Sequence, residues 1–213
     1  MGITIFAQGK IGRIEDIPRL IGDLKAVAEE HKWKYRIIDD DFEVRPNAAL
    51  TPRDSGASGA AIEGCLGLKG IVLNVESGVE PLSILFDRSG VLTDMFQQIS
   101  WIETNGGNER FSACKTQFGS IDSHIQVIEI LDLVKKKYMA DLVINDEGSY
   151  WETRDRRILA EKRIALGHYL RHTEKVISSI DLSGDDVQDP DAVARRIEEA
   201  LLKADEDGRL GHS

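Results

Sequence analysis

Hydrophobic residues recur along the chain with two different periods, and these periods predict an alternation of strands and helices. Short apolar runs rich in β-branched residues are typical of strands, and they occupy residues 3–8, 34–38, 69–75, 81–86, 111–118 and 142–144. Stretches in which apolar residues recur every three or four positions are typical of helices, and they occupy residues 17–28, 121–137 and 155–180. The pattern therefore predicts an α+β fold.

Two segments of the chain share one order of elements. Residues 3–43 predict a strand, a glycine turn, a helix and a second strand that ends in acidic residues, and residues 111–152 predict the same order. Because right-handed crossovers place the helices of such units on one face of a shared sheet, we expect a mixed, largely antiparallel sheet with two β-α-β units, helices packed on one face and a long C-terminal helix. An internal duplication explains the repeated order, and a chance match of two common units is the alternative.

The segment between these two units carries weaker signals. Residues 46–70 hold two prolines and five glycines, which predicts a long loop that leads into the third strand. This loop lacks the GxxxxGK[ST] and GxGxxG patterns that cradle phosphate groups. A turn at residues 87–90 predicts a hairpin, and residues 101–104 predict one more short strand.

Charge separates the end of the chain from its body. Residues 181–213 contain ten acidic and four basic residues, which account for −6 of the net charge of −10. We therefore expect residues 1–180 to form a single α+β domain, followed by an acidic linker and a short amphipathic helix that opens at Pro190. Because few apolar residues of this tail can join the core, deleting residues 183–213 is expected to leave a folded body.

Composition argues against several classes of function. With 41% hydrophobic and 30% charged residues, the chain has the composition of a soluble globular protein. Its acidic net charge repels phosphate backbones, which argues against nucleic-acid binding, and no apolar run reaches the roughly 20 residues that span a bilayer. Cys65 and Cys114 form no CxxC motif, so we expect two reduced, buried thiols. The first residues lack the features of a signal peptide, which predicts a cytoplasmic protein.

Three short sequences and the opening of the chain carry a resemblance to other proteins. They are Lys-Thr-Gln at 115–117, Asp-Ser-His at 122–124, the run 145–153, and Met-Gly-Ile-Thr-Ile at 1–5. In these motifs, and over most of residues 1–180, the chain resembles a family of uncharacterised bacterial proteins. The resemblance implies a bacterial source and one domain type, and it carries no chemistry over to this chain.

The candidate ligand site lies after residue 111. Side chains alternate along a strand, so Lys115 and Gln117 share a face, and Asp146 shares one with Glu152 if the chain stays extended. The expected patch consists of Lys115, Gln117, Asp146, Tyr150, Trp151 and Glu152. It would supply a cation, an amide, two carboxylates and aromatic rings, which suit a polar ligand. The alternative is a polar sheet face with cross-strand ion pairs.

His124 is the candidate catalytic residue. It lies in the first turn of a predicted helix, where the helix N-terminus favours the neutral form of histidine that accepts protons. Glu152, with Asp146 or Glu147 as the other choices, would be its carboxylate partner in a hydrolase-type mechanism. The alternative is a partly buried histidine behind a capping Asp122.

Two further clusters have the residue types of a metal site. Residues 39–41 are three aspartates that could meet Asp146 and Glu147 around Mg²⁺ or Ca²⁺, but their spacing fits no EF-hand, and acids commonly end strands at turns. His168 and His172 are one helical turn apart, but the Glu of the HExxH motif is absent between them. We therefore predict no metal site, and the sequence assigns no cofactor.

The sequence leaves two hypotheses of function. The first is a small-ligand-binding or regulatory protein without catalytic activity, whose partners are a small molecule and, as an allowed assembly, a second copy of the chain. The second is a hydrolase-type enzyme that uses His124 with nearby acidic residues, with or without a divalent cation. The first requires only a cavity, whereas the second requires His124 to lie within hydrogen-bond reach of a carboxylate, or of a ligand site, in a concave pocket.

Overall fold

The computed structural model describes residues 2–52, 60–180 and 190–206. The chain divides into two units, Gly2–Leu159 and the part from Ala160 onward. The first unit holds all the strands that the structure describes. The linker expected at 181–189 lies outside the described residues, and the domain boundary expected near residue 180 stays a prediction.

The described strands form antiparallel sheets. One sheet contains β8 (Ser112–Lys115), β1 (Thr4–Gln8) and β9 (Val143–Asp146) in that order. A second contains β2 (Lys34–Asp39), β5 (Leu68–Asn74), β6 (Leu82–Asp87) and β7 (Leu92–Thr93) in that order. A small third sheet pairs β3 (Ala49–Pro52) with β4 (Ala60–Glu63). Together with the helices, these sheets confirm the predicted α+β class.

The two larger sheets meet where β8 lies beside the start of β6. The backbone N–H of Glu80 donates to the carbonyl oxygen of Lys115 at 2.9 Å, and the Ser112 hydroxyl donates to the carbonyl oxygen of Ser83 at 2.6 Å. Every residue of β6 is buried, because this strand lies between two cores on opposite faces.

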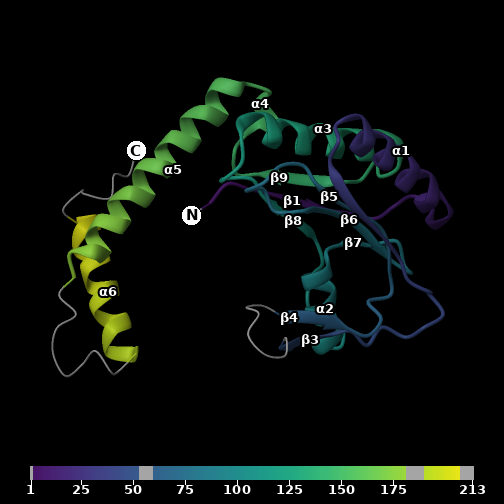
Figure 1. Cartoon of the computed structure of the whole chain (residues 1–213), viewed down its shortest axis with the longest axis horizontal. Helices are drawn as coiled ribbons and strands as arrows, with labels where there is room; N and C mark the ends of the chain where they lie inside the picture. The colour runs from purple at the N-terminus through teal and green to yellow at the C-terminus, as the bar shows by residue number, and fades with distance from the viewer. Residues whose placement is uncertain (1, 53–59, 181–189, 207–213) are drawn as a thin grey trace. The chain divides into compact units, whose positions relative to one another are not determined.

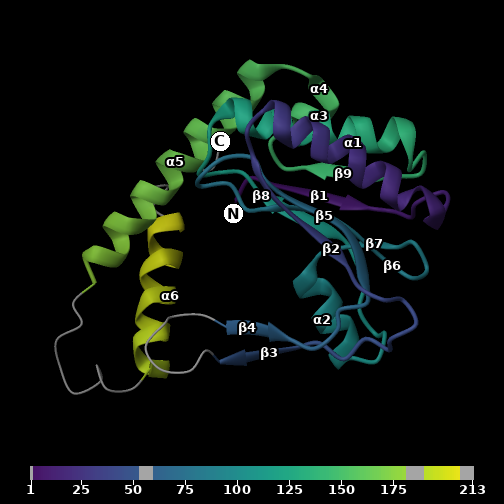
Figure 2. The same cartoon turned by 45° about the vertical axis from the view of Figure 1, so that its right-hand side comes forward.

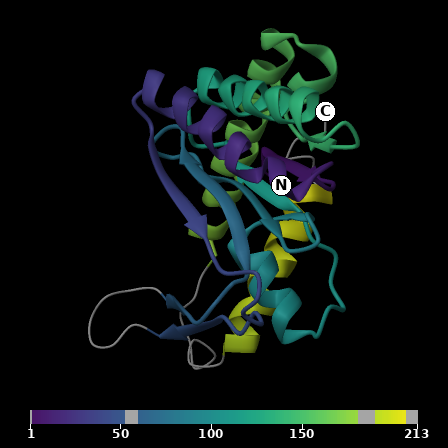
Figure 3. The ribbon, with the colours of Figure 1, turned by 90° about the vertical axis from the view of Figure 1, so that its right-hand side faces the viewer.

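The larger core lies under α1 (Ile17–Glu30) and α3 (Ile121–Lys137), which lie side by side on one face of the sheets (Figure 1 and Figure 3). Both helices bury apolar residues that recur every three or four positions, namely Leu20, Leu24 and Ala28 in α1 and Val127, Leu131 and Val134 in α3. The Ser120 hydroxyl caps α3 by accepting from the N–H of Ser123 at 3.0 Å. The expected packing of both helices on one face is confirmed.

The smaller core lies on the opposite face, beneath α2 (Met95–Glu103) (Figure 2). Its buried residues are Ile38, Ala48, Leu66, Leu68, Val72, Leu85 and Ile99. The short strand predicted at 101–104 is therefore wrong. Asp94 caps a helix here by accepting from the N–H of Gln97 at 2.8 Å, and Met95, Ile99 and Ile102 follow at helical spacing.

The loop expected over residues 46–70 contains the third sheet. Strands β3 and β4 face each other in register, with Ala49 opposite Glu63 and Pro52 opposite Ala60. Each strand is only four residues long, so the glycines and prolines of this segment favoured the prediction of a loop.

Both predicted strand–helix–strand units are present as β1-α1-β2 and β8-α3-β9. Their strands pair differently, because β8 and β9 flank β1 in one sheet whereas β1 and β2 lie in different sheets. The order of elements is therefore shared, and their origin by duplication stays a hypothesis.

The second unit is helical where it is described. The predicted long helix is confirmed as α5 (Arg156–Ser178), which begins in the first unit, and α6 (Pro190–Glu206) opens at the predicted proline. None of the described helices has the length and apolar character that crossing a membrane requires.

Candidate functional site

Sheet register decides which face each predicted site residue occupies. Ile5 in the central strand pairs with Cys114 on one side and with Asp146 on the other. Residues paired across an antiparallel sheet share a face, so Asp146 lies on the face of buried Ile5 and Cys114, which is covered by α1 and α3. Asp146 therefore points into the protein, and its side chain has no exposed surface.

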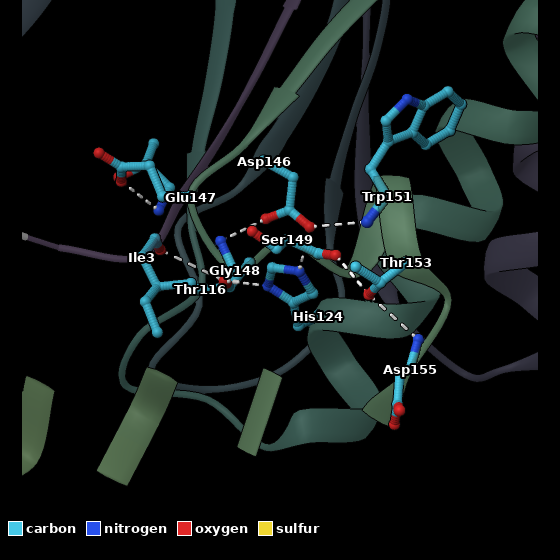
Figure 4. A network of polar contacts seen from close by, with 11 residues as sticks. Ile3, Thr116, His124, Asp146, Glu147, Gly148, Ser149, Trp151, Thr153 and Asp155 are labelled. Atoms are coloured by element: carbon cyan, nitrogen blue, oxygen red, sulfur yellow. Dashed lines mark hydrogen bonds and ion pairs between the residues drawn. The ribbon is translucent and has the colours of Figure 1, made fainter. Parts of the chain in front are cut away.

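His124 meets Asp146 from α3 and joins it to the end of β8 (Figure 4). The ring nitrogen Nε2 lies 3.2 Å from Oδ2 of Asp146, and Nδ1 lies 2.7 Å from the Thr116 hydroxyl oxygen. The His124 side chain is fully buried. The end of β8, the first turn of α3 and the end of β9 are therefore joined at one imidazole ring.

The hydrogen bonds of this ring restrict where its protons lie. In the neutral form, Nε2–H donates to Asp146 and the Thr116 hydroxyl donates to Nδ1. In the charged form, Nδ1–H donates to Thr116, whose own proton then turns to the carbonyl oxygen of Ile3 at 3.3 Å. The neutral form with the proton on Nδ1 would place the Nε2 lone pair against a carboxylate oxygen, so the geometry excludes it.

The carboxylate of Asp146 also organises the turn that follows β9. Its Oδ1 accepts from the N–H of Gly148 at 2.7 Å, and its Oδ2 accepts from the N–H of Trp151 at 2.9 Å. Burial alone would raise the pKa of Asp146, but the hydrogen bond and charge of His124 and these two N–H groups lower it below its usual range. Asp146 is therefore held as a carboxylate that accepts from the first turn of α4 (Tyr150–Thr153).

Gly148 allows the turn to close over the histidine. A Cβ atom at this position would lie 2.8 Å from Cε1 of His124 and 2.8 Å from Cδ1 of Leu159. Ser149, the next residue, has a φ of 58°, and Thr153 donates its hydroxyl proton back to the Ser149 carbonyl oxygen at 2.6 Å. We refer to Thr116, His124, Asp146 and Gly148 as the His124 network.

The predicted patch around Lys115 and Asp146 does not form in this arrangement. Lys115 pairs with Thr4, one position away from the row of Ile5, so its side chain lies on the opposite face from Asp146. Gln117 lies near the N-terminal residues, where its Oε1 accepts from the N–H of Ile3 at 3.2 Å. The expectation of one shared face is wrong. Pairing across the sheet places Asp146 in the row of Ile5, and Lys115 lies one position outside that row.

The aromatic residues and Glu152 belong to a helix rather than to an extended strand. Because α4 begins at Tyr150, the alternation expected for Tyr150 and Glu152 ends there, and Glu152 is exposed. Tyr150 packs edge-on against the His124 ring with centroids 6.5 Å apart, and Trp151 carries the Arg154 guanidinium 4.5 Å from its ring. The structure thus brings His124, Asp146 and Tyr150 together and leaves Glu152 outside. The ligand-binding and catalytic roles of these residues stay predictions.

The acidic residues considered for a metal have other partners. Asp39 pairs with Lys69 at 2.6 Å, Asp40 accepts from the N–H of Leu68 at 3.2 Å, and Asp41 accepts from the N–H of Glu43 at 2.9 Å. In the described part of the chain no cluster of three or more His, Cys, Asp or Glu residues has the geometry to hold a metal ion.

A cavity of about 480 Å³ lies on the other side of the sheets, next to α2. We refer to it as the α2 cavity. Its lining comes from the loop after β2, the end of β6 and the C-terminal half of α2, and consists of Phe42, Glu43, Val44, Arg45, Pro46, Gly67, Asp87, Arg88, Gln98, Trp101, Ile102 and Asn105. Its volume is in the range of pockets that enclose small molecules. None of these residues belongs to the His124 network.

A buried ion pair fixes one wall of the α2 cavity. Asp87 pairs with Arg110 at 2.7 Å, and both side chains are about nine-tenths buried. The second oxygen of Asp87 accepts from the N–H groups of Ser89 and Val91, each at 2.9 Å. The Arg110 guanidinium lies 4.6 Å from the ring centroid of Trp101. The ion pair therefore holds the β6 turn and the α2 aromatic ring in one position.

Two further contacts shape the same wall. The Gln98 amide donates to the carbonyl oxygen of Leu66 at 2.8 Å, and its oxygen lies 3.4 Å from Nη1 of Arg110. Gly67 has a φ of 67°, and a Cβ atom there would lie 2.6 Å from Cγ of Pro46. The lining is thus built from satisfied polar groups and closely packed loops.

Sequence reasoning missed the α2 cavity. Its residues lie in four separated segments between positions 42 and 105, and none of them matches a known motif. Asp87 was expected only as part of a hairpin turn, and Trp101 was expected on a strand. The sequence shows Arg88 and Arg110 near aromatic residues, but this proximity along the chain does not indicate that the four segments meet around one cavity.

The structure shows an α+β protein with a cavity of about 480 Å³ next to α2. The chain matches no protein-family model, no curated protein and no solved structure. The resemblance to a bacterial family therefore stays an expectation.

Proposed function

We propose that this protein binds a small molecule in the α2 cavity and acts as a binding or regulatory protein rather than as an enzyme. The observation that carries the proposal is the cavity itself, whose wall is fixed by the buried pair of Asp87 and Arg110. A preformed cavity with apolar walls and a few convergent polar groups is the usual form of a small-molecule site.

The lining combines the two kinds of group that such a site needs. Apolar contact comes from Phe42, Val44, Trp101 and Ile102, and polar contact comes from Asn105 and the charged residues of the lining. Because the polar wall is already hydrogen-bonded within the protein, a ligand would lose little free energy in ordering it.

The alternative, a hydrolase that uses His124, has less support. His124 is fully buried, and both ring nitrogens already face protein partners, Thr116 and Asp146. A catalytic base must reach the proton that it removes, so this mechanism would require the His124 network to open. The network instead links α3 to the ends of β8 and β9.

The proposal is tested by a fragment screen with ligand-observed NMR on the full chain and on two tryptophan variants. Val44→Trp places a large ring at the cavity, where Val44 is 46% exposed, and Leu50→Trp is the matched control because Leu50 is 44% exposed and does not line the cavity. We expect fragments that bind the parent and Leu50→Trp but not Val44→Trp. Fragment binding that survives in Val44→Trp, or a screen without any binder, would refute the proposal.

A further inference from the structure

The α2 cavity has two arginines in its lining, although the protein as a whole is acidic. Arg45 and Arg88 both line it, and within the described part of the chain neither forms an ion pair. Glu43 is one carboxylate of the lining, and the other, Asp87, is already paired with Arg110. Two guanidinium groups therefore face one uncommitted carboxylate, although the whole chain has a net charge of −10.

The hydrogen bonds of Asp87 affect the balance of charge in the cavity lining. Its two oxygens accept from Arg110 and from the backbone N–H groups of Ser89 and Val91, which follow it in the turn. Arg88 follows Asp87 in the same turn, lines the cavity and is exposed. A guanidinium group without a protein carboxylate suits a carboxylate or phosphate group of a ligand, which it can bind through two parallel hydrogen bonds.

Two aromatic rings line the same cavity. Trp101 comes from α2 and Phe42 from the loop after β2, and each carries a cation near its ring, Arg110 at 4.6 Å and Lys69 at 5.2 Å from the centroid. These contacts hold the rings in place. Fixed aromatic walls favour a flat group that stacks offset or edge-on against them.

We infer that the ligand of the α2 cavity is a small anion that also carries a flat ring. Arg45 and Arg88 bind its carboxylate or phosphate group, and Trp101 and Phe42 contact its ring. This inference rests on the proposed function, because it names the class of ligand for the same cavity.

Isothermal titration calorimetry with four probes tests the inference: phenyl phosphate, benzoate, inorganic phosphate and benzyl alcohol. We expect the two ring-bearing anions to bind more tightly than inorganic phosphate, which lacks the ring, and than benzyl alcohol, which lacks the charge. Comparing phenyl phosphate with benzoate identifies which anion is preferred. Binding of the anions should weaken as salt is added, because the two arginines are exposed to solvent.

The double variant Arg45→Gln with Arg88→Gln isolates the charge. It should weaken binding of the preferred ring-bearing anion by about ten-fold or more and leave benzyl alcohol unaffected. Arg36→Gln is the matched control, because Arg36 is an exposed arginine of β2 that does not line the cavity. Thermal unfolding of each variant should show that the fold is retained, since all three arginines are exposed.

Each part of the inference has its own refuting result. Benzyl alcohol binding as tightly as benzoate, or anion binding unchanged in the double variant, would overturn the assignment of an anion. Inorganic phosphate binding as tightly as phenyl phosphate would overturn the assignment of a ring. In these cases the proposed function survives if Val44→Trp still abolishes fragment binding, whereas loss of that result removes both.

Discussion

Removing the carboxylate of Asp146 should destabilise the protein far more than removing an exposed carboxylate. In Asp146→Ala, three donors lose their acceptor: the N–H groups of Gly148 and Trp151, and Nε2–H of His124. A buried donor left without a partner costs about 1–3 kcal/mol, and three such losses occur together here. Because the terms overlap, we expect a loss of about 3–5 kcal/mol of unfolding free energy in total.

The conservative variant Asp146→Asn should have a smaller effect. Its single oxygen can still accept from Trp151 and His124, which both bond Oδ2, while its amide nitrogen faces the N–H of Gly148. Only the N–H of Gly148 then loses its acceptor, so we expect the Asn variant to cost about 1–3 kcal/mol of unfolding free energy. The order of stability should therefore be parent, Asn variant, Ala variant.

Stability should also depend on pH through Asp146. Its pKa is lowered in the folded protein, so the unfolded chain binds a proton at a higher pH than the folded one. The carboxylate therefore stabilises the fold above the ordinary aspartate pKa of about 3.9, and this contribution is lost as the pH falls below that value towards the folded pKa. Asp146→Asn should show a shallower loss of stability over this acidic range than the parent.

Urea unfolding followed by tryptophan fluorescence and circular dichroism measures these effects. Asp39→Ala is the control, because the Asp39 side chain is 71% exposed and its pair with Lys69 should contribute no more than about 1 kcal/mol. A common slope of unfolding free energy against urea would show that the unfolded states are comparable. Asp146→Ala within about 1 kcal/mol of the parent would refute the account of the network.

Three further predictions concern packing, thiol chemistry and the end of the chain. Gly148→Ala should cost about 1–3 kcal/mol of unfolding free energy in urea, because its Cβ would press on the His124 ring. Gly22→Ala, with nothing within 4 Å of its Cβ, should instead stabilise α1 by about 0.5–1 kcal/mol. Equal effects of the two variants would contradict this account. Burial raises the pKa of Cys114 to about 12, so a thiol reagent at pH 8 should modify the partly exposed Cys65 and reach Cys114 only on unfolding; fast reaction of both would show that Cys114 is accessible. Deleting residues 183–213 should leave a cooperative unfolding transition, and its loss in calorimetry would place this segment in the core.

Local patterns predicted most elements correctly because their causes are local. The helix at α3 follows from apolar spacing and from the Ser120 hydroxyl that caps its first turn. The helix α2 was missed for the opposite reason: its cap, Asp94, lies outside the stretch 101–104 that was interpreted as a strand. Aromatic and β-branched residues in a short window favour a strand. In the folded protein, the Asp94 cap and packing in the core of Ile38 and Leu85 stabilise this segment as a helix instead.

The candidate site was predicted in part. His124 and Asp146 were both selected from their residue types and positions, and the structure places them 3.2 Å apart. Glu152 was added by extending strand alternation, which fails because α4 starts at Tyr150. Lys115 follows the alternation of β8, but the sheet register places it on the face opposite Asp146. The alternation rule applies only while the backbone stays extended, and Asp146 itself ends that conformation by accepting from the N–H of Trp151.

The sequence by itself determined most of the elements and the order of the two strand–helix–strand units, because periodicity, caps and turns act over a few residues. Only the tertiary structure decided that Asp146 faces α3, since that choice depends on its register with Ile5 across the sheet. Only the tertiary structure created the α2 cavity, where Phe42, Arg88 and Trp101 converge from separate segments. Contacts between residues far apart in the chain are fixed by packing of the whole core, and no local pattern encodes them.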